Sequence, residues 1–254
     1  MSKHRRHGEI LALLEARGEQ SVEDLAARFG VSPMTVRRDL ADLAAAGQAQ
    51  RTHGGAVLSP TGIAQFRFVR RHESMSAEKR AIARLAAARI RPGMTVLIDT
   101  GTTALEVARE LRPVDGLRIV TTSLPVAAEL HDAPGHELLL LGGTVRRGEP
   151  DLTGPLTERN LAEFRVDVAI LGADAAEPAG VFTDDPAVAR VSRAMISAAR
   201  DAILVLDHGK FARRAFAKYA DWSQFAAMVT DSGLPEPVRS WLARSGPELV
   251  LART

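Results

Sequence analysis

The stretch from Val31 to Ala56, VSPMTVRRDLADLAAAGQAQRTHGGA, constrains the fold most, because a capped amphipathic helix leads into a glycine-hinged basic segment. Ser32 before Pro33 marks a helix start: serine caps free backbone N–H groups, and proline suits the first helical position. Three apolar residues recur at helical spacing and predict the buried face, namely Val36, Leu40 and Leu43.

The polar side of this predicted helix points away from the buried face. Arg38 lies about 200° from Val36 on a helix with 3.6 residues per turn, so it should face solvent. Thr35 and Arg37 lie on the flanks, near the exposed N-terminal end. Arginine can pair bidentately with guanine, so both arginines are candidates for base contacts. The sequence leaves open which of them contacts bases.

A β-hairpin is predicted directly after the helix, which ends at Gly47. Residues 48–52 can form its first strand and residues 56–58 its second, with a tight glycine turn between them. This hairpin would lie beside the helix as a wing. The candidate DNA-binding residues near its tip are Arg51, His53, Gly54 and Gly55.

Two further short helices are expected upstream, at residues 5–17 and 22–29, with Gly30 as the turn before Val31. Three helices and a basic hairpin predict a winged helix-turn-helix, in which the second helix of the motif enters the major groove while the first braces it. We expect DNA contacts from Ser32, Pro33, Thr35, Arg37 and Arg38, and phosphate contacts from among Lys3, Arg5, Arg6 and Arg28.

A simpler alternative concerns Arg38 and Asp42, which are four residues apart. They could pair with each other on a solvated helix face and have no further role. The helix and turn upstream and the basic hairpin downstream favour DNA binding instead.

Composition excludes several classes of protein. The 254 residues suffice for one large or two ordinary domains, and 46% are hydrophobic. The absence of cysteine removes disulfides, thiol catalysis and cysteine–zinc sites. No apolar run reaches the ~18 residues of a membrane span, and no signal peptide is evident, so we expect a cytoplasmic protein. Residues 1–75 hold 11 Lys and Arg against 8 Asp and Glu, which indicates DNA binding only weakly.

From Ala77 onward helices and strands alternate, which predicts a larger α/β domain with a mostly parallel sheet covered on both faces. Apolar runs such as VLI, LLLL and VAIL fit strands that are buried on both faces. We predict a DNA-binding domain at 1–58, a linker at 59–75 and the α/β domain at 76–254. Strands are expected at 95–99, 118–121, 137–142, 166–171, 202–207, 225–230 and 248–251, and helices at 77–90, 103–111, 124–131, 156–164, 186–199 and 236–245.

Ligands of parallel α/β sheets bind beyond the carboxyl ends of the strands. The segment 99–103, DTGTT, lies between a strand and a helix, where Gly101 allows a tight turn. Amides at the helix start and threonine hydroxyls can bind a phosphate there, although a capped helix start explains the segment about as well. Other hydroxyls, carboxylates and cations follow the strands and together suit a polyhydroxylated anion: Ser123, Arg146, Arg147, Asp174, His208 and Lys210.

The runs VS-x-x-TVRRDL and R-x-HGGA resemble the N-terminal signature of the DeoR family of bacterial transcriptional regulators. Further motifs fall in family order: Glu78-Lys79, DTGTT, TTS at 121–123, LLLLGGTVR at 138–146 and Gly209-Lys210-Phe211. The resemblance implies a winged helix-turn-helix, usually of a repressor, on a sugar-phosphate sensor domain. That sensor domain is related in fold to ribose-5-phosphate isomerase and to coenzyme A transferases.

The resemblance also implies roles for residues of the sensor domain. The loop with Asp99, Gly101, Thr102 and Thr103 would hold the phosphate, and Asp174 and Lys210 would meet the sugar. The expected effector-binding set is completed by Lys79, Ser123 and Arg146. Two segments depart from the family and bear on ligand choice: Asp184-Asp185-Pro186-Ala187 stands where a Glu-Ala pair is frequent, and Asp207-His208-Gly209-Lys210 lacks a serine expected before the lysine.

Two functions follow from these patterns. The first is a repressor of a carbohydrate-metabolism operon, controlled by a phosphorylated sugar. As a homodimer or homotetramer it would present recognition helices about 34–36 Å apart to palindromic or repeated sites in double-stranded DNA. The second is a sugar-phosphate isomerase-like enzyme with an accessory N-terminal domain. The chain shows no catalytic Glu in a glycine-rich loop of the isomerase kind, so we expect no catalytic residue, no metal site, no cofactor and no membrane partner.

Overall fold

The computed structural model describes residues 1–59 and 68–253, which form two compact units. Met1–Arg71 with Arg147–Glu149 make up the first unit, and His72–Arg146 with Pro150–Thr254 the second. Residues 60–67 of the predicted linker, 59–75, lie outside the described residues. The domain limits at residues 58 and 76 remain a prediction. None of the described helices is long and apolar enough to span a membrane.

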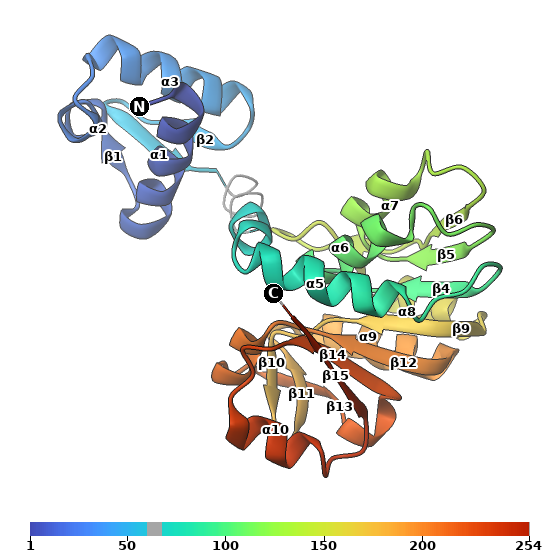
Figure 1. Ribbon diagram of the computed structural model, residues 1–254. Coiled ribbons are helices and arrows are strands. Elements are labelled where there is room, and N and C mark those ends of the chain that lie inside the picture. The colour runs from blue at the N-terminus through green and yellow to red at the C-terminus, as the bar shows by residue number, and fades with distance from the viewer. Residues whose placement is uncertain (60–67, 254) are drawn as a thin grey trace. The chain divides into compact units, whose positions relative to one another are not determined.

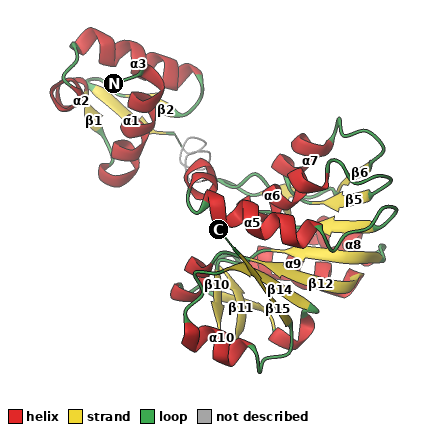
Figure 2. Ribbon diagram, in the orientation of Figure 1, coloured by secondary structure: helices red, strands yellow, loops and turns green. Residues whose placement is uncertain are grey.

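Three helices and a three-stranded antiparallel sheet make up residues 3–58 of the N-terminal unit (Figures 1 and 2). They form the predicted winged helix-turn-helix, in which α2 and α3 are the motif and the β2–β3 hairpin is the wing. The first helix begins two residues earlier than predicted, since Ser2 caps it. The elements are α1 (Lys3–Arg17), β1 (Gln20–Ser21), α2 (Val22–Phe29), α3 (Pro33–Ala45), β2 (Ala49–Arg51) and β3 (Gly55–Leu58), with strand order β1-β3-β2.

Local caps define the helix-turn-helix. The Ser32 hydroxyl accepts a hydrogen bond from the Thr35 backbone N–H at 3.2 Å, and Ser21 accepts one from Asp24 at 3.0 Å. Gly30 ends α2 at φ 63°, a left-handed conformation that glycine adopts without steric cost. The predicted inner face of α3 is confirmed, because its apolar residues join those of α1 and α2 in one core: Ile10, Leu14, Leu25, Val36, Leu40 and Leu43.

The C-terminal unit is built on a seven-stranded sheet in the order β15-β14-β12-β9-β4-β5-β6. Every pairing in it is parallel, so the predicted mostly parallel sheet is confirmed. Within this sheet the chain starts at the interior strand β4, adds β5 and β6 on one side and then adds the remaining four strands on the other. The strands are β4 (Thr95–Ile98), β5 (Arg118–Thr121), β6 (Glu137–Leu140), β9 (Val166–Leu171), β12 (Ala199–Val205), β14 (Ala227–Asp231) and β15 (Glu248–Ala252).

Helices cover both faces of this sheet. On one face α5 packs against α6 and α6 against α7, while α8 and α9 pack together on the other (Figure 1). The predicted helices and strands of this unit are all present, with ends within three residues of the expected ones. The helices are α5 (Ser76–Ala87), α6 (Thr102–Leu111), α7 (Leu124–Leu130), α8 (Pro155–Ala162), α9 (Pro186–Ala198) and α10 (Glu236–Leu242).

Several short elements were not predicted. A small antiparallel sheet and a two-stranded hairpin have strands of two to four residues, too short to show an alternating pattern. Two of their pairings are local hairpins, while one joins segments more than 30 residues apart, which only the folded chain defines. They are β10 (Ala175–Glu177), β11 (Gly180–Thr183) and β13 (Ala217–Ala220) in the small sheet, β7 (Thr144–Val145) and β8 (Leu152–Thr153) in the hairpin, and the 3-10 helices η1 (His208–Ala212) and η2 (Trp222–Gln224).

Burial of the LLLL run on both faces was predicted, and this is wrong. The run falls on β6, an edge strand of the sheet. Leu138 and Leu139 are only half-buried and Leu140 is 45% exposed, while Leu141 just beyond the strand is buried. An apolar run predicts a strand but does not distinguish a central position from an edge, because strand order is a tertiary property.

Gly55 holds the wing against the rest of the N-terminal sheet. It pairs with Ser21 of β1, and a Cβ at Gly55 would lie 1.9 Å from the backbone oxygen of Gln20. No side chain fits that space without moving β1. The neighbouring Gly54 differs, since a Cβ there would meet nothing within 4 Å.

We therefore expect Gly55→Ala to push β3 away from β1 and to lower the free energy of unfolding by about 1–3 kcal/mol, the usual cost of overpacking. The matched control Gly54→Ala should change it by no more than about 0.5 kcal/mol. Urea unfolding of the two variants and the parent protein measures both effects. Equal destabilisation by the two substitutions would contradict this role of Gly55.

Candidate nucleic-acid interface and effector site

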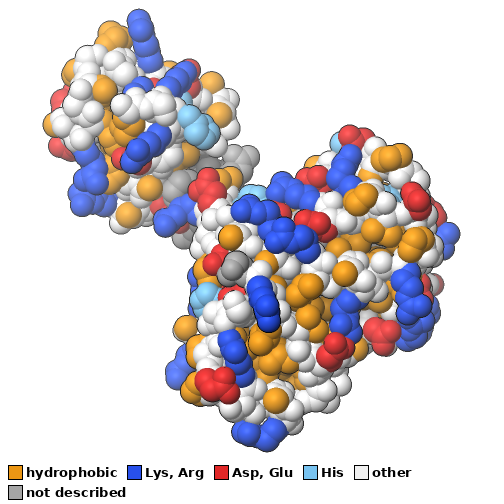
Figure 3. Space-filling model, viewed as in Figure 1, with side chains coloured by type: hydrophobic (Ala, Val, Ile, Leu, Met, Phe, Trp, Pro, Cys, Tyr) orange, Lys and Arg blue, Asp and Glu red, His pale blue; other side chains and the backbone are white. Residues whose placement is uncertain are grey.

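Lys and Arg side chains are exposed over the N-terminal unit (Figure 3), and the outer surface of α3 carries two exposed arginines. Arg37 comes within 3.7 Å of Glu23, with both side chains largely exposed. Arg38 is exposed and makes no ion pair with any residue in 1–59 or 68–253. The alternative pairing of Arg38 with Asp42 is wrong, because Asp42 pairs with Lys3 at 2.8 Å. Both arginines are thus presented to solvent by a helix whose opposite side is held in the core.

Residues at the start of α3 and in the wing complete this surface. Ser32 and Pro33 are exposed, while Thr35 is half-buried and lies 2.9 Å from the Ser32 hydroxyl. In the wing, Arg51, His53 and Gly54 are exposed. Gly55, also predicted to contact DNA, is buried instead, so it shapes the wing and offers no surface.

Arg6 does not lie on this surface, which corrects its expected phosphate contact. Its guanidinium donates to both carboxylate oxygens of Asp39, with Nε–Oδ2 at 2.6 Å and Nη2–Oδ1 at 3.1 Å, and both side chains are buried. Burial alone would raise the pKa of Asp39, but hydrogen bonds from Arg6 and His7 outweigh burial and lower it. This ion pair ties α1 to the buried side of α3.

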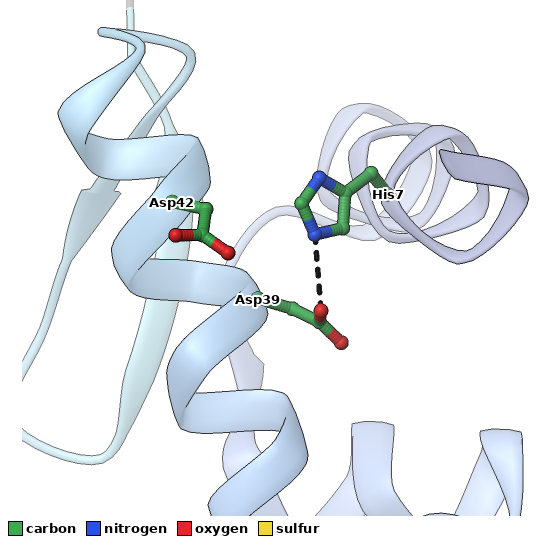
Figure 4. A group of neighbouring side chains, drawn as sticks. All are labelled: His7, Asp39 and Asp42. Carbon is green, nitrogen blue, oxygen red and sulfur yellow. Dashed lines mark hydrogen bonds and ion pairs between the residues drawn. The ribbon is translucent and has the colours of Figure 1, made fainter. Parts of the chain in front are cut away.

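Three potential metal-ligand atoms also meet between α1 and α3 (Figure 4). His7 Nε2 lies 3.0 Å from Asp39 Oδ1, and atoms of His7, Asp39 and Asp42 lie within 4.8 Å of one another. Both carboxylates already pair with a cation, Asp39 with Arg6 and Asp42 with Lys3. A divalent cation would have to displace these side chains, so the geometry favours an internal brace over a metal site.

We expect Asp39→Ala to lower the free energy of unfolding by about 3–5 kcal/mol, because Arg6 is left buried without its partner. In an Asp39→Leu background, Arg6→Met removes a buried charge that has lost its partner. Arg6→Met should therefore lower the free energy of unfolding by less in this background than in the parent. The double-mutant cycle, measured by urea unfolding, should show strong coupling between the two positions. Additive effects would contradict a buried ion pair.

In the C-terminal unit, the predicted phosphate loop follows β4. Asp99 ends that strand and is fully buried; its Oδ1 accepts from Thr100 N–H at 2.8 Å and its Oδ2 from Gly172 N–H at 3.2 Å. Asp99 therefore links the loop after β4 to the loop after β9. Gly101 has φ 106°, which excludes most other residues, and it begins α6.

Thr102 and Thr103 form the first turn of α6, and both side chains are buried. Thr102 is the first residue of a helix whose N-terminal amides have no partner within the helix. The positive end of the helix dipole lies here, next to the carboxyl ends of β4 and β9. The loop thus joins a strand to a helix start through Gly101, as predicted, while its binding of an anion stays a prediction.

Ser123 and Arg146 both contact Asp151, whose side chain is buried. Arg146 grips Asp151 with two hydrogen bonds, of 2.7 and 2.5 Å, and reaches Asp185 at 3.3 Å. Ser123 pairs with Asp151 through a backbone bridge and caps α7 with its hydroxyl. Neither carboxylate was singled out as a site residue from the sequence, and only the fold brings Asp151 to this place.

Asp174 and Lys210 follow strands at the same edge of the sheet, whereas Lys79 lies on α5. Asp174 follows β9 and accepts from the Thr183 hydroxyl at 2.8 Å and from Asp184 N–H at 3.0 Å. Lys210 is half-buried within η1, after β12. Lys79 is buried on α5, and its ammonium donates to the carbonyl of Ser74 at 2.6 Å.

The carboxylates at this edge of the sheet lie close enough to affect the pKa of Asp99. The pKa of Asp99 is raised to about 7, because burial disfavours its charge; its two backbone hydrogen bonds oppose the shift, while Asp151 and Asp174 add to it. Burial, with Asp99 and Asp174 nearby, also raises the pKa of Tyr219, whose hydroxyl donates to the Gly172 carbonyl at 2.5 Å. Tyr219 gave no signal in the sequence.

The fold and the two surfaces together define a winged helix-turn-helix regulator with an α/β sensor domain. The DeoR-like helix-turn-helix domain matches residues 6–61, and the DeoR C-terminal sensor domain matches residues 74–232. The chain belongs to the DeoR family of transcriptional regulators.

Individual relatives match over nearly the whole chain. The glycerol-3-phosphate regulon repressor of Escherichia coli K12 is 37% identical over 239 residues, 94% of this chain and 94% of its own. The transcriptional repressor CsqR of the same strain is 36% identical over 97% of this chain and 94% of its own. Among solved structures, ribose 5-phosphate isomerase A from Methanocaldococcus jannaschii covers 54% of this chain and 55% of its own, with 20% identity and a TM-score of 0.40.

Asp99 should make stability fall as pH rises. Its pKa is about 7 in the folded protein and about 3.9 in an unfolded chain, so between these values the folded state holds a proton that unfolding releases. Its contribution to the free energy of unfolding is therefore most favourable below about pH 4 and declines toward pH 7. Asp99→Asn should remove this slope in urea unfolding at a series of pH values. A variant with the parent's slope would contradict the raised pKa.

Proposed function

We propose that this protein is a repressor of a carbohydrate-metabolism operon that binds double-stranded operator DNA through α3 and the wing. This proposal rests on one observation, namely that α3 is buried on one side and exposes arginines on the other. One side is fixed by Val36, Leu40 and the buried Arg6–Asp39 pair, and the other presents Arg37 and Arg38 to solvent. A helix held in this way can enter a major groove with defined orientation.

The wing and the start of α3 supply the remaining DNA contacts in this proposal. Exposed Arg51 and His53 flank the helix, and Ser32 and Pro33 begin it. Contacts to phosphates set the register, whereas Arg37 or Arg38 identifies bases. We propose a homodimer or homotetramer, since two-fold symmetry matches palindromic or repeated operators.

For the sensor domain we propose a phosphorylated sugar as the effector. The relatives include a glycerol-3-phosphate regulon repressor, and the loop at 99–103 combines helix amides with Gly101 in a conformation open to an anion. Asp174, Ser123 and Arg146 would meet hydroxyls or the phosphate, and Lys210 and Lys79 supply positive charge. The effector acts by binding one conformation more tightly and thereby shifting the DNA-binding population.

We further propose that the chain is not an enzyme and uses no cofactor. Its named relatives are transcriptional repressors, and its carboxylates at the sheet edge are engaged by backbone N–H groups and by Arg146. We propose a cytoplasmic location, because that is where a repressor meets operator DNA.

The test is operator binding with and without phosphate esters. Fluorescence anisotropy on DNA from upstream of its gene should show specific binding, which Arg38→Ala or Arg37→Ala weakens by about 10- to 100-fold, the loss of one bidentate base contact. Arg84→Ala, an exposed arginine of the C-terminal unit, is the control and should bind as the parent does.

One ester from a panel of sugar phosphates should change the affinity of the parent for this DNA. Thr102→Val and Lys210→Ala should retain DNA binding and lose that response. A parent protein that never binds DNA from its own locus, with or without esters, would overturn the regulator. Aldose–ketose interconversion by the parent protein would support the enzyme instead.

A further inference from the structure

His208 and Asp231 form a pair of side chains at the carboxyl edge of the sheet that the effector site above does not use. Asp231 ends β14 and is 1% exposed, while His208 begins η1 just after β12. His208 Nδ1 lies 2.6 Å from Asp231 Oδ2, and the His208 backbone N–H donates to Oδ1 at 2.8 Å. The buried carboxylate therefore holds both the backbone and the ring of His208.

Gly233 makes this arrangement possible. Its N–H donates to Asp231 Oδ2 at 2.9 Å, and a Cβ at this position would lie 2.5 Å from His208 Nδ1. The imidazole thus packs directly on the glycine backbone. A ring that is hydrogen-bonded at one nitrogen and packed closely on its backbone neighbour has one defined orientation.

The Asp231 bond assigns the tautomer of His208. A carboxylate accepts hydrogen bonds, so Nδ1 carries the hydrogen and the neutral ring keeps its lone pair on Nε2. Within residues 1–59 and 68–253, Nε2 has no hydrogen-bond partner, and 33% of the side chain is exposed. The protein therefore presents an oriented acceptor at the sheet edge, two residues before Lys210.

Strand order gives the spacing between the loop that carries His208 and the phosphate loop. β12 is separated from β4 by β9 alone, and neighbouring strands lie about 4.8 Å apart, so the two loops are roughly 10 Å apart. A ligand that contacts both loops must extend across the end of β9, where Asp174 lies. A pentose or hexose chain with a terminal phosphate has this reach, whereas a three-carbon ester is shorter.

We propose that His208 is an effector-binding residue whose Nε2 accepts a hydrogen bond from a hydroxyl remote from the phosphate, and that the effector is a five- or six-carbon sugar phosphate. This inference rests on the proposed function of the sheet edge. Asp231 and Gly233 are positioning residues, since they act through the ring of His208. His208 thereby contributes to the choice of ligand in a segment that lacks the serine expected before Lys210.

His208→Asn tests the contact, because its Nδ2 can replace Nδ1 at Asp231 while nothing replaces Nε2. Thermal unfolding is measured against ribose 5-phosphate, fructose 6-phosphate and glycerol 3-phosphate. Without ester, the variant should unfold at the parent's midpoint. With the five- or six-carbon ester that stabilises the parent, its apparent affinity should be about tenfold weaker, as expected for one lost hydrogen bond. Gly233→Ala, which displaces the ring, should show the same loss of affinity.

His131→Asn is the matched control, since His131 is an exposed histidine at the far end of α7; it should respond to the esters as the parent does. If an ester stabilises the parent and His208→Asn equally, the inference is wrong and the proposed effector site stands. If glycerol 3-phosphate alone stabilises the parent, the assignment of ligand length is wrong. If none of the three esters stabilises the parent, both the sugar-phosphate site and this inference are overturned.

Discussion

Parallel hydrogen bonding between neighbouring strands is the constraint on which the C-terminal unit depends. It places the chain segments that follow β4, β9, β12 and β14 at one edge, although they are spread from residue 99 to residue 233. Asp99 then links two of these segments by accepting N–H groups from both, and Asp231 orients a third. Both carboxylates are buried, so these hydrogen bonds link segments that are distant in sequence.

In the N-terminal unit, the main structural requirement is a defined orientation of α3. The apolar core of this unit packs one side of α3, and the Arg6–Asp39 pair adds two directional hydrogen bonds between α1 and α3. A buried ion pair contributes little net stability compared with apolar packing, but losing one partner is costly. This pair therefore specifies the position of α3, and with it that of Arg37 and Arg38.

Elements with strong local signals could be predicted from the sequence. The helix start at Ser32, the turn at Gly30 and the alternation of apolar strands with helices are found where expected. The role of DTGTT was an expectation from its place between a strand and a helix, and its loop has the predicted backbone. The roles of single residues were harder to predict. Arg6 was expected to contact phosphate at the surface, and it is buried. Gly55 was expected to contact DNA, and it is instead needed for the close packing of β3 on β1.

The sequence by itself determined the family, the two kinds of fold and the order of their elements, because caps, glycine turns and apolar periodicity act within a few residues. Only the tertiary structure decided that Asp39 meets Arg6, Asp185 meets Arg146 and Asp231 meets His208, because these partners are 33, 39 and 23 residues apart. It also decided that β6 is an edge strand. Pairings across the fold leave no periodic trace in the chain, since each depends on the position of every strand or helix between the partners.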